Sequence, residues 1–393
     1  MSAPLDGIKV LDLSRVLAAP FATMTLGDLG AEVWKIENPA EGDETRNWAP
    51  PAFEGTATYY LAVNRNKASL AVDFRTKDGQ EIVRELARRA DILVENYITG
   101  ALARYGLDYE SLRAVNPRLI YCSVSGYGRT GALAARPGYD FIIQAESGLM
   151  SINGEPAGTP QKFGVAISDL LAGQYATQAI LAALYARERT GTGQAIDIAL
   201  YDASIAALIN VGSAVLNGGF VAKRYGNAHP SIVPYQTFET ADAPLVLACA
   251  NNRQFHDLCT AVINRPELAA DPRFTTNTLR VTNRHALLTI LSDCFTERTC
   301  DDVIAACITA NVPAGRVRTV EEALASQEVA DRGMVYDAGG RRSTGSPMHF
   351  SATPVRRPSA PPALGADGER ILKSVLGYSA DRLRDLRAAK VIV

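Results

Sequence analysis

The sequence has little of what marks a metalloenzyme or a nucleic-acid-binding protein. Only four histidines occur among 393 residues, and none stands in an HxxxH or HExxH spacing, so we expect no metal site. The 40 Lys and Arg are balanced by 42 Asp and Glu, a net charge of −2, whereas a nucleic-acid surface needs a basic surplus. Small molecules or proteins are therefore the expected partners.

Three further absences concern the cell compartment. Six cysteines are present, but none forms a CxxC pair, and their apolar settings indicate reduced core residues. The N-terminal stretch MSAPLDGIKVLDLS has neither the charged start nor the apolar segment of a secretory signal. No apolar run approaches the ~18 residues of a membrane span. We expect a cytoplasmic protein that does not bind a membrane.

The length predicts two domains, because single cores seldom grow beyond about 250–300 residues. Hydrophobic residues make up 47% and charged residues 21%, which is typical of a globular enzyme. A less regular pattern of apolar residues around 218–230 and a Pro-rich tail beyond 341 indicate the domain boundaries. We predict a large domain over 1–225, a smaller α+β domain over 226–325, and a C-terminal segment over 326–393 that returns to the large domain as an extended strap.

Strands and helices alternate along the first third of the chain. Strands are predicted at 7–14, 31–37, 69–74, 91–96 and 119–125, and helices from Pro20 and over 77–89. Pro20 suits a first helical turn, since its missing N–H would be unpaired there. This alternation predicts an α/β fold, with a Rossmann-like parallel sheet covered by helices on both faces.

A glycine-rich run raises the question of dinucleotide binding. GYGRTG at 126–131 matches GxGxxG and follows a predicted strand. In a true fingerprint the glycines open a helix whose N-terminus holds the pyrophosphate, but here Pro137 and Gly138 interrupt the stretch almost at once. We interpret the run as a plain glycine-rich loop.

One acid at a predicted helix start is the candidate nucleophile. Neither a GxSxG elbow nor a Cys/His signature is present, which excludes the commonest nucleophilic hydrolases. Asp169 stands where a strand-like GVAIS gives way to an apolar helix over 169–187, which Gly191 and Gly193 would end. From the residues alone, N-capping is the commoner use of such an Asp, and a catalytic role remains open beside it.

Several long motifs resemble the class III CoA-transferase family. They are VLDLSRVLAAPFATMTLGDLGAEVWKIENP, ENYITG, RPGYDFIIQAESGL, GVAISDLLAG and GNAHPSIVPYQTF, and the likeness runs essentially end to end. TYYLAVNRNKAS, NNRQF and LRVTNR look most like the branch that exchanges CoA between succinate and glutarate. The resemblance implies an interlocked homodimer that uses acyl-CoA and small carboxylic acids as substrates and has no permanently bound cofactor.

The resemblance also assigns roles to residues. Asp169, which ends the stretch that begins at Gly164, would attack the donor thioester and then carry CoA as an aspartyl thioester. Arg65 and Arg280 would hold the far carboxylate of a dicarboxylic acid. The positions expected to bind CoA are Leu17, Ala18, Asp73, Arg75, Asn96, Tyr97, Arg104, Arg136 and Tyr139.

Three departures from the family's patterns bear on the function. Asn38 replaces an arginine of the formyl-CoA branch, so that phosphate contact would be lost or taken over by Lys35. GNAHPS at 226–231 replaces a glycine-rich run, which argues against oxalate as the acceptor. Tyr139 replaces the histidine with which relatives racemise 2-methylacyl-CoA, and tyrosine is too weak a base near neutral pH for that task.

Three other functions stay open on the same fold: a 2-methylacyl-CoA racemase, an acyl-CoA hydrolase and a non-catalytic CoA-binding subunit. A hydrolase would differ only in whether water reaches the covalent intermediate. A binding subunit stays open because a fold does not guarantee an activity. The donor and acceptor acids are not determined at this stage, since the shape of the pocket selects them.

Overall fold

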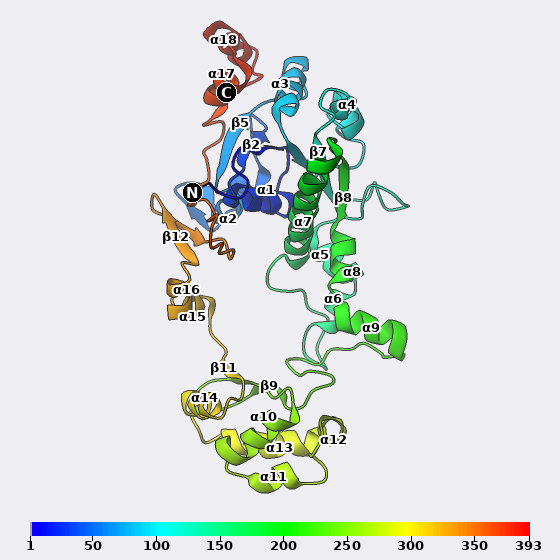
Figure 1. Ribbon diagram of the computed structural model, residues 1–393, viewed down its shortest axis with the longest axis vertical. Coiled ribbons are helices and arrows are strands. Elements are labelled where there is room, and N and C mark those ends of the chain that lie inside the picture. Colours follow the sequence, from blue (N-terminus) through cyan, green and yellow to red (C-terminus); the bar gives the residue numbers. More distant parts are fainter. Residues whose placement is uncertain (1) are drawn as a thin grey trace. The chain divides into compact units, whose positions relative to one another are not determined.

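The computed structural model describes residues 2–393, which divide into two compact units (Figure 1). Unit 1 holds the residues up to 150, together with 162–221 and 328–393. Unit 2 holds 151–161 and 222–327. The small domain expected over 226–325 falls within unit 2, and nearly all of the C-terminal segment falls within unit 1.

Unit 1 is built on a six-stranded parallel sheet. In sheet order the strands are β5 (Lys67–Ala71), β2 (Glu32–Glu37), β1 (Lys9–Asp12), β6 (Ile92–Glu95), β7 (Ile120–Ser125) and β8 (Ala195–Ala199). Numbered along the chain, these strands have the 3-2-1-4-5-6 order of the Rossmann fold. The predicted parallel α/β sheet is confirmed, and β8 is a strand that the prediction lacked.

Helices cover both faces of this sheet, as predicted. Along β1, Val10 packs toward one face and Leu11 toward the other, because successive side chains of a strand alternate. One face is covered by α1 (Ala18–Asp28), α5 (Asp140–Glu146), α7 (Ile167–Thr190) and α8 (Leu200–Ala206). The other is covered by α3 (Lys77–Arg89), α4 (Tyr109–Arg113), α17 (Gly368–Leu376) and α18 (Ala380–Ala388). In Figure 1, α1 and α7 lie side by side.

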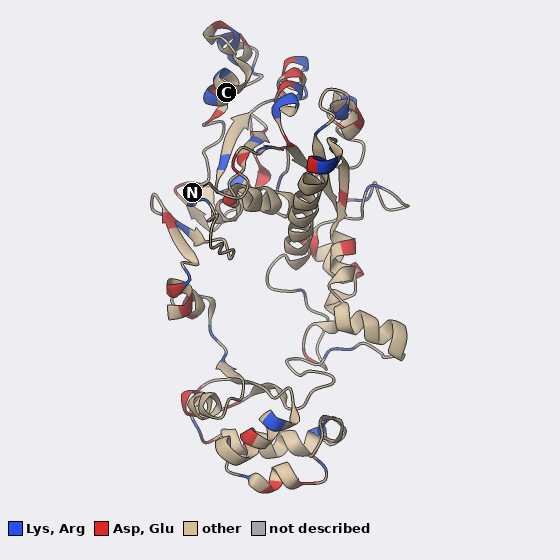
Figure 2. Ribbon diagram, in the orientation of Figure 1, with Lys and Arg blue, Asp and Glu red and all other residues tan. Residues whose placement is uncertain are grey.

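The helix that contains Asp169 differs from its prediction at both ends. It spans Ile167–Thr190, so the last two residues of GVAIS, Ile167 and Ser168, belong to its first turn, and only 164–166 are irregular. Gly191 caps the helix with φ 75°, as predicted. Gly193 serves a different need, since a Cβ there would come 2.0 Å from the carbonyl oxygen of Leu119. Figure 2 shows that α7 is uncharged over most of its length.

Shorter elements and an extended segment complete unit 1. The strap over 345–363 has neither helix nor strand, as its prolines predict, and is held by hydrogen bonds. The Arg356 N–H donates to Asp28 O at 2.7 Å and the Ser359 N–H to Asn66 Oδ1 at 2.7 Å. The remaining short elements, of which α6 and α16 extend over the boundary of the units, are η1 (Glu44–Asn47), β3 (Ala52–Phe53), β4 (Thr56–Ala57), α2 (Thr58–Ala62), η2 (Ala103–Tyr105), α6 (Leu149–Ile152), α9 (Ile209–Gly218), α16 (Gln327–Asp331), β12 (Val335–Ala338) and β13 (Arg341–Thr344).

Unit 2 is an α+β body with its own core, as predicted for the smaller domain. Its antiparallel sheet has the order β11 (Ala314–Arg316), β10 (Leu245–Ala248) and β9 (Tyr235–Phe238). Its helices are α10 (Asn252–Asp257), η3 (Leu258–Val262), α11 (Pro266–Ala270), α12 (Asn277–Thr282), α13 (Arg284–Phe295), α14 (Cys300–Thr309) and α15 (Val320–Leu324).

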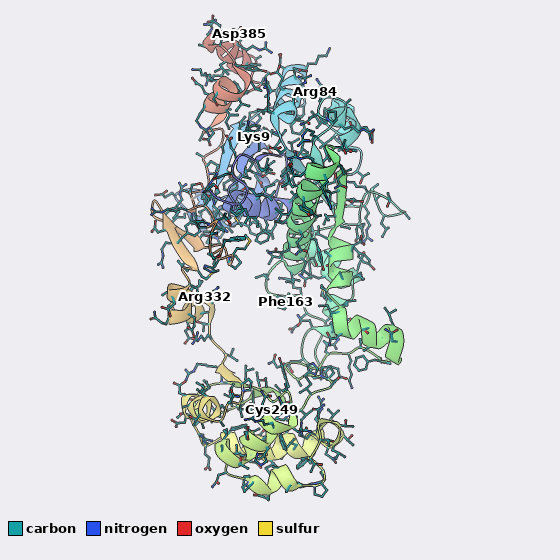
Figure 3. The ribbon with its side chains drawn as sticks, viewed as in Figure 1. Lys9, Arg84, Phe163, Cys249, Arg332 and Asp385 are labelled. Atoms are coloured by element: carbon teal, nitrogen blue, oxygen red, sulfur yellow. The ribbon has the colours of Figure 1, made fainter. Side chains whose placement is uncertain are left out.

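The cysteines occur as free thiols. Five of the six are buried, including Cys249 in the core of unit 2 (Figure 3), and Cys294 is partly exposed. The expectation of reduced core residues is therefore confirmed for five of them. Within residues 2–393, no single helix combines the length and hydrophobicity of a membrane span, although the bent pair α8 and α9 meets those criteria jointly.

Candidate active site

The candidate site lies at the carboxyl edge of the sheet, where the strand order reverses. β1 stands between β2 and β6, so the loops that follow β1 and β6 diverge to opposite sides. Open α/β sheets bind their ligands in the crevice that forms at such a point. Here the two loops are joined by a pair of hydrogen bonds. The Arg15 N–H donates to Asn96 Oδ1 at 2.9 Å, and Asn96 Nδ2 donates to Arg15 O at 2.7 Å.

Two small pockets adjoin at this edge. The inner pocket, about 210 Å³, is lined by residues that include Leu17, Ala18, Asn96, Tyr97, Arg136, Tyr139 and Asp169. The outer pocket, about 220 Å³, is lined by residues that include Asp73, Arg75, Tyr97 and Arg104. The two pockets share Arg15, Glu44 and Tyr97. The fold thus brings all nine positions that the resemblance assigned to CoA into two neighbouring pockets.

Arginines of these pockets are paired with carboxylates. Arg75 pairs with Asp73 at 2.8 Å, and the guanidinium holds the pKa of that carboxyl below its usual range. Arg136 pairs with Glu146 at 2.7 Å. A residue that sequence reasoning missed, Arg15, pairs with Glu44 at 2.6 Å at the junction of the two pockets. Its guanidinium also lies 4.9 Å from the ring centre of Tyr97.

The expectation that Lys35 could replace a lost phosphate contact is wrong. Lys35 borders the outer pocket, but its side chain has no exposed surface. Its ammonium group donates to Ser14 O at 2.8 Å and pairs with Asp43 at 2.9 Å. Because both partners are internal, the charge of Lys35 is used within the protein and does not meet a ligand.

The wall of the inner pocket depends on two glycines. A Cβ on Gly126, in the glycine-rich loop, would come 2.7 Å from the Cα of Gly138, and a Cβ on Gly138 would come 2.9 Å from the Cα of Gly126. The two backbones therefore pack directly against each other. The next helix, α5, begins only at Asp140, so the glycine run does not open a helix. This geometry agrees with the interpretation as a plain loop.

A third, larger cavity also borders Asp169. This large pocket, about 850 Å³, shares Val16, Leu17, Tyr139 and Asp169 with the inner pocket. Its further lining is mainly apolar and aromatic, with Phe21, Met24, Trp48, Tyr59, Val63, Phe141 and Met348 among its members. Two basic residues, Arg65 and Lys162, also line it. Lys162 lies next to Phe163, which Figure 3 marks on the loop that leads into α7.

The structure excludes the N-cap interpretation of Asp169. The N-cap of α7 is Ala166, which makes no side-chain capping bond, and Asp169 lies inside the first turn. The cap comes instead from α5, where Asp140 Oδ1 accepts the N–H of Ser168 at 2.8 Å. The carboxylate of Asp169 is therefore not used as the cap, and it lies at the positive end of an apolar helix.

The surroundings of Asp169 make it an unusual carboxyl. Burial and the neighbouring Asp140 carboxylate raise the pKa of Asp169 to about 7, while a hydrogen bond from the backbone of Ala18 opposes that rise. Burial, with these same two carboxylates, raises the pKa of Tyr59 to about 12, so Tyr59 remains a hydroxyl donor near neutral pH. A poorly solvated carboxylate that titrates near neutrality is suited to nucleophilic catalysis.

The two arginines expected to bind a dicarboxylate have different surroundings. Arg65 lines the large pocket, but Asp28 binds its guanidinium at 2.8 and 2.5 Å, and Thr344 O accepts from it at 3.0 Å. Arg280 is completely buried in unit 2, where it donates to the backbone carbonyls of Val233 at 2.8 Å and Phe274 at 3.0 Å. These bonds give Arg280 a structural use, and its role in substrate binding stays a prediction.

Comparison with known proteins agrees with this site. The sequence model of CoA-transferase family III matches residues 5–368. The chain is 43% identical to the succinyl-CoA:glutarate CoA-transferase of Mus musculus, over 99% of this chain and 90% of that protein. It is 44% identical to the succinate–glutarate CoA-transferase of Agrobacterium fabrum, over 94% of this chain and 95% of that protein.

A solved structure is similar to this chain in both fold and sequence. The crystal structure of a CAIB/BAIF family protein from Brucella suis superposes with a TM-score of 0.87 at 45% identity, and the match covers 95% of this chain and 100% of that one. Fold, pockets and sequence therefore lead to the same assignment. The chain belongs to CoA-transferase family III.

Proposed function

We propose that the protein transfers CoA from succinyl-CoA to a dicarboxylic acid such as glutarate, through a CoA thioester on Asp169. One observation carries this proposal: Asp169 lines both the inner pocket and the large pocket. A thioester carbonyl held at its carboxylate would have CoA on one side and the acyl group on the other. The activities named for the relatives from Mus musculus and Agrobacterium fabrum support the pair of acids.

The CoA moiety would extend from the outer pocket through the inner pocket to Asp169. Arg15, Arg75 and Arg104 of the outer pocket supply guanidinium groups, which bind phosphates in a bidentate manner. The inner pocket, which has Gly126 in its lining and borders Asp169, would hold the unbranched pantetheine chain. When CoA binds, Arg15 and Arg75 would leave their present carboxylate partners and bind phosphates instead.

The first half of the reaction would place CoA on the enzyme. A carboxylate oxygen of Asp169 attacks the thioester carbonyl of succinyl-CoA; the C–S bond breaks, CoA leaves as a thiolate, and a mixed anhydride remains. The thiolate then attacks the Asp169 carbonyl of that anhydride. Succinate leaves, and CoA is bound to Asp169 as a thioester.

The second half repeats these steps in reverse order with the acceptor. The acceptor carboxylate attacks the Asp169 thioester and forms a new anhydride, and the released thiolate then takes the acceptor's acyl group. Asp169 is regenerated as a carboxylate. Since one thioester replaces another, the exchange needs no ATP, and the main task of the protein is to keep water from the anhydride.

The large pocket would select the acids. Its apolar lining suits a short methylene chain, and its two basic residues, Arg65 and Lys162, can attract a second carboxylate. The charge of Arg65 is largely compensated by Asp28, whereas the exposed Lys162 donates a long hydrogen bond of 3.3 Å to Phe163 O and forms no ion pair with a described residue. We therefore assign the far carboxylate to Lys162 together with Arg65.

The test is CoA transfer from succinyl-CoA to a panel of mono- and dicarboxylates. Wild type should form glutaryl-CoA, Asp169→Ala should form none, and Glu188→Ala, at the exposed far end of α7, should behave as wild type. Mass spectrometry should find CoA on the peptide that contains Asp169. Thioester hydrolysis without transfer would indicate a hydrolase, and α-proton exchange without transfer a racemase. CoA binding without any adduct would indicate a binding subunit.

Assembly and location are part of the proposal. We propose an interlocked homodimer, supported by α9, which carries no charged residue (Figure 2) and exposes 75% of Ile209 and 85% of Leu216. Six free thiols favour a reducing compartment such as the cytoplasm. Light scattering of the purified protein should give the mass of a dimer, and a monomer would contradict the assembly.

A further inference from the structure

The loop after β1 contains a strained residue. Val16 has φ 68°, in the left-handed region that β-branched residues disfavour. Such a conformation persists only where the surroundings hold it, and it is most often found at functional sites. Val16 immediately precedes Leu17 and Ala18, which line the inner pocket next to Asp169.

A buried ion pair holds the first end of this loop. Lys35, on β2, donates to Ser14 O at 2.8 Å and pairs with Asp43 at 2.9 Å. Asp43 in turn accepts the N–H of Val16 at 3.3 Å. Neither charged side chain has more than 1% of its surface exposed, so the pair is shielded from solvent and salt.

A second buried pair holds the other end. Lys67, on β5, donates to Pro20 O at 3.0 Å and pairs with Asp12 at 3.0 Å. Asp12 also accepts the hydroxyl of Thr23, on α1, at 2.7 Å. The segment from Ser14 to Pro20 is thus fixed at both ends by lysines from neighbouring strands.

The fixed segment positions one backbone group beside Asp169. Ala18, which begins α1 between these two ion pairs, lines the inner pocket together with Asp169. Its backbone is also the group that counteracts the raised pKa of Asp169. Burying two ion pairs is expensive, and apolar residues of similar size could fill this space. Each lysine nevertheless also donates to a backbone carbonyl of this segment, Lys35 to Ser14 O and Lys67 to Pro20 O in the first turn of α1, which indicates that the two pairs fix the position of the segment.

We propose that the Lys35–Asp43 ion pair is a positioning device that keeps Val16 in its strained conformation and so aims the N–H of Ala18 at Asp169. The inference rests on the proposed function of Asp169. In the ground state this N–H stabilises the carboxylate. When thiolate attacks the Asp169 carbonyl, the same N–H stabilises the negative charge that develops on its oxygen. Lys35 and Asp43 act through the loop and do not touch the substrate.

The test compares three changes at this pair with a matched control. Asp43→Asn keeps the volume and an acceptor oxygen, Lys35→Met removes the loop's donor, and the double variant leaves no lone buried charge. The control is Arg187→Met, which breaks the partly buried Arg187–Asp91 pair at the far end of α7. The readouts are kcat, the KM for succinyl-CoA, the pH at which activity rises, and the single-turnover rate of adduct formation on Asp169.

We expect each change at the pair to lower kcat and the adduct rate about tenfold or more, with KM changed less than about threefold. The rise in activity should move to higher pH, because the Ala18 hydrogen bond that lowers the pKa of Asp169 is weakened. The control should change neither kcat and the adduct rate nor the pH profile. Folded Asp43→Asn protein with wild-type kcat and an unmoved pH profile would overturn the inference. If wild type forms no adduct, the proposed function itself fails.

Discussion

Asp140 on helix α5 accepts the N–H of Ser168 at 2.8 Å and thereby caps helix α7 in place of Asp169. The same carboxylate raises the pKa of Asp169 through like-charge repulsion. Asp140 therefore caps the helix, while the carboxylate of Asp169 is not used as a cap and has a pKa near neutrality. This division of roles supports the use of Asp169 as a nucleophile.

Replacing Asp140 by Asn should shift the pH dependence of the reaction. The amide oxygen can still accept the N–H of Ser168, but the negative charge beside Asp169 is gone. The pKa of Asp169, about 7 in the wild type, should fall, so kcat/KM for succinyl-CoA should reach its plateau at lower pH. Glu188→Gln, on the exposed end of α7, should leave the profile in place. An unmoved profile in Asp140→Asn would refute the coupling.

Asp169→Asn should abolish transfer and make the protein more stable above neutral pH. The folded pKa of about 7 lies above that of an unfolded Asp, so wild type loses stability as pH rises from ~4 to ~7, and the full penalty is present above that range. Asn cannot ionise, and the variant should gain about 1–3 kcal/mol at about pH 8. The gain should shrink at about pH 5 in urea denaturation, and a pH-independent difference would contradict the shifted pKa.

Arg15 should contribute to CoA affinity. Arg15→Gln removes a guanidinium at the junction of the inner and outer pockets and should raise the KM for succinyl-CoA about tenfold, most strongly at low salt. Glu44→Gln releases Arg15 from its present partner and should lower the KM or leave it unchanged. Equal increases in both variants would show that the Arg15–Glu44 pair supports the fold and does not bind phosphate.

Lys162 should discriminate between one and two carboxylates. Lys162→Met keeps most of the length of the side chain but removes its charge from the large pocket. The KM for glutarate should rise several-fold, by about 1 kcal/mol, while the KM for butyrate should not change. Equal effects on both acids would assign Lys162 to the shape of the pocket. No effect on either would leave Arg65 as the basic residue that selects the acceptor.

Arg280 should act mainly on stability. Arg280→Met would leave the carbonyls of Val233 and Phe274 without their buried donor, and should cost about 2–4 kcal/mol in urea denaturation. We expect no selective change in the KM for dicarboxylates. A rise in that KM, without a matching rise for butyrate, would instead support the role in substrate binding that the sequence resemblance assigned.

The sequence predicted correctly those helices and strands whose formation depends mainly on neighbouring residues. The predicted helix 77–89 agrees residue for residue with α3, because Thr76 caps its start and its buried positions recur at helical spacing. Five of the six strands of the parallel sheet were predicted, because their side chains are buried on both faces and form short apolar runs. The sixth, β8, was missed, since its side chains are mostly exposed or partly exposed. GVAIS was predicted wrongly as a strand, because its last two residues, Ile167 and Ser168, begin α7, whose cap Asp140 is distant in the sequence.

The sequence by itself determined the α/β class, the motifs of the family and the identity of the acid at 169. Whether Asp169 caps a helix or stands free was decided only in three dimensions, because the alternative cap, Asp140, is 29 positions away along the chain. The burial of Lys35 and the strain at Val16 were likewise decided by tertiary packing. Side-chain solvation and long-range contacts set these properties, and neither can be read from neighbouring residues.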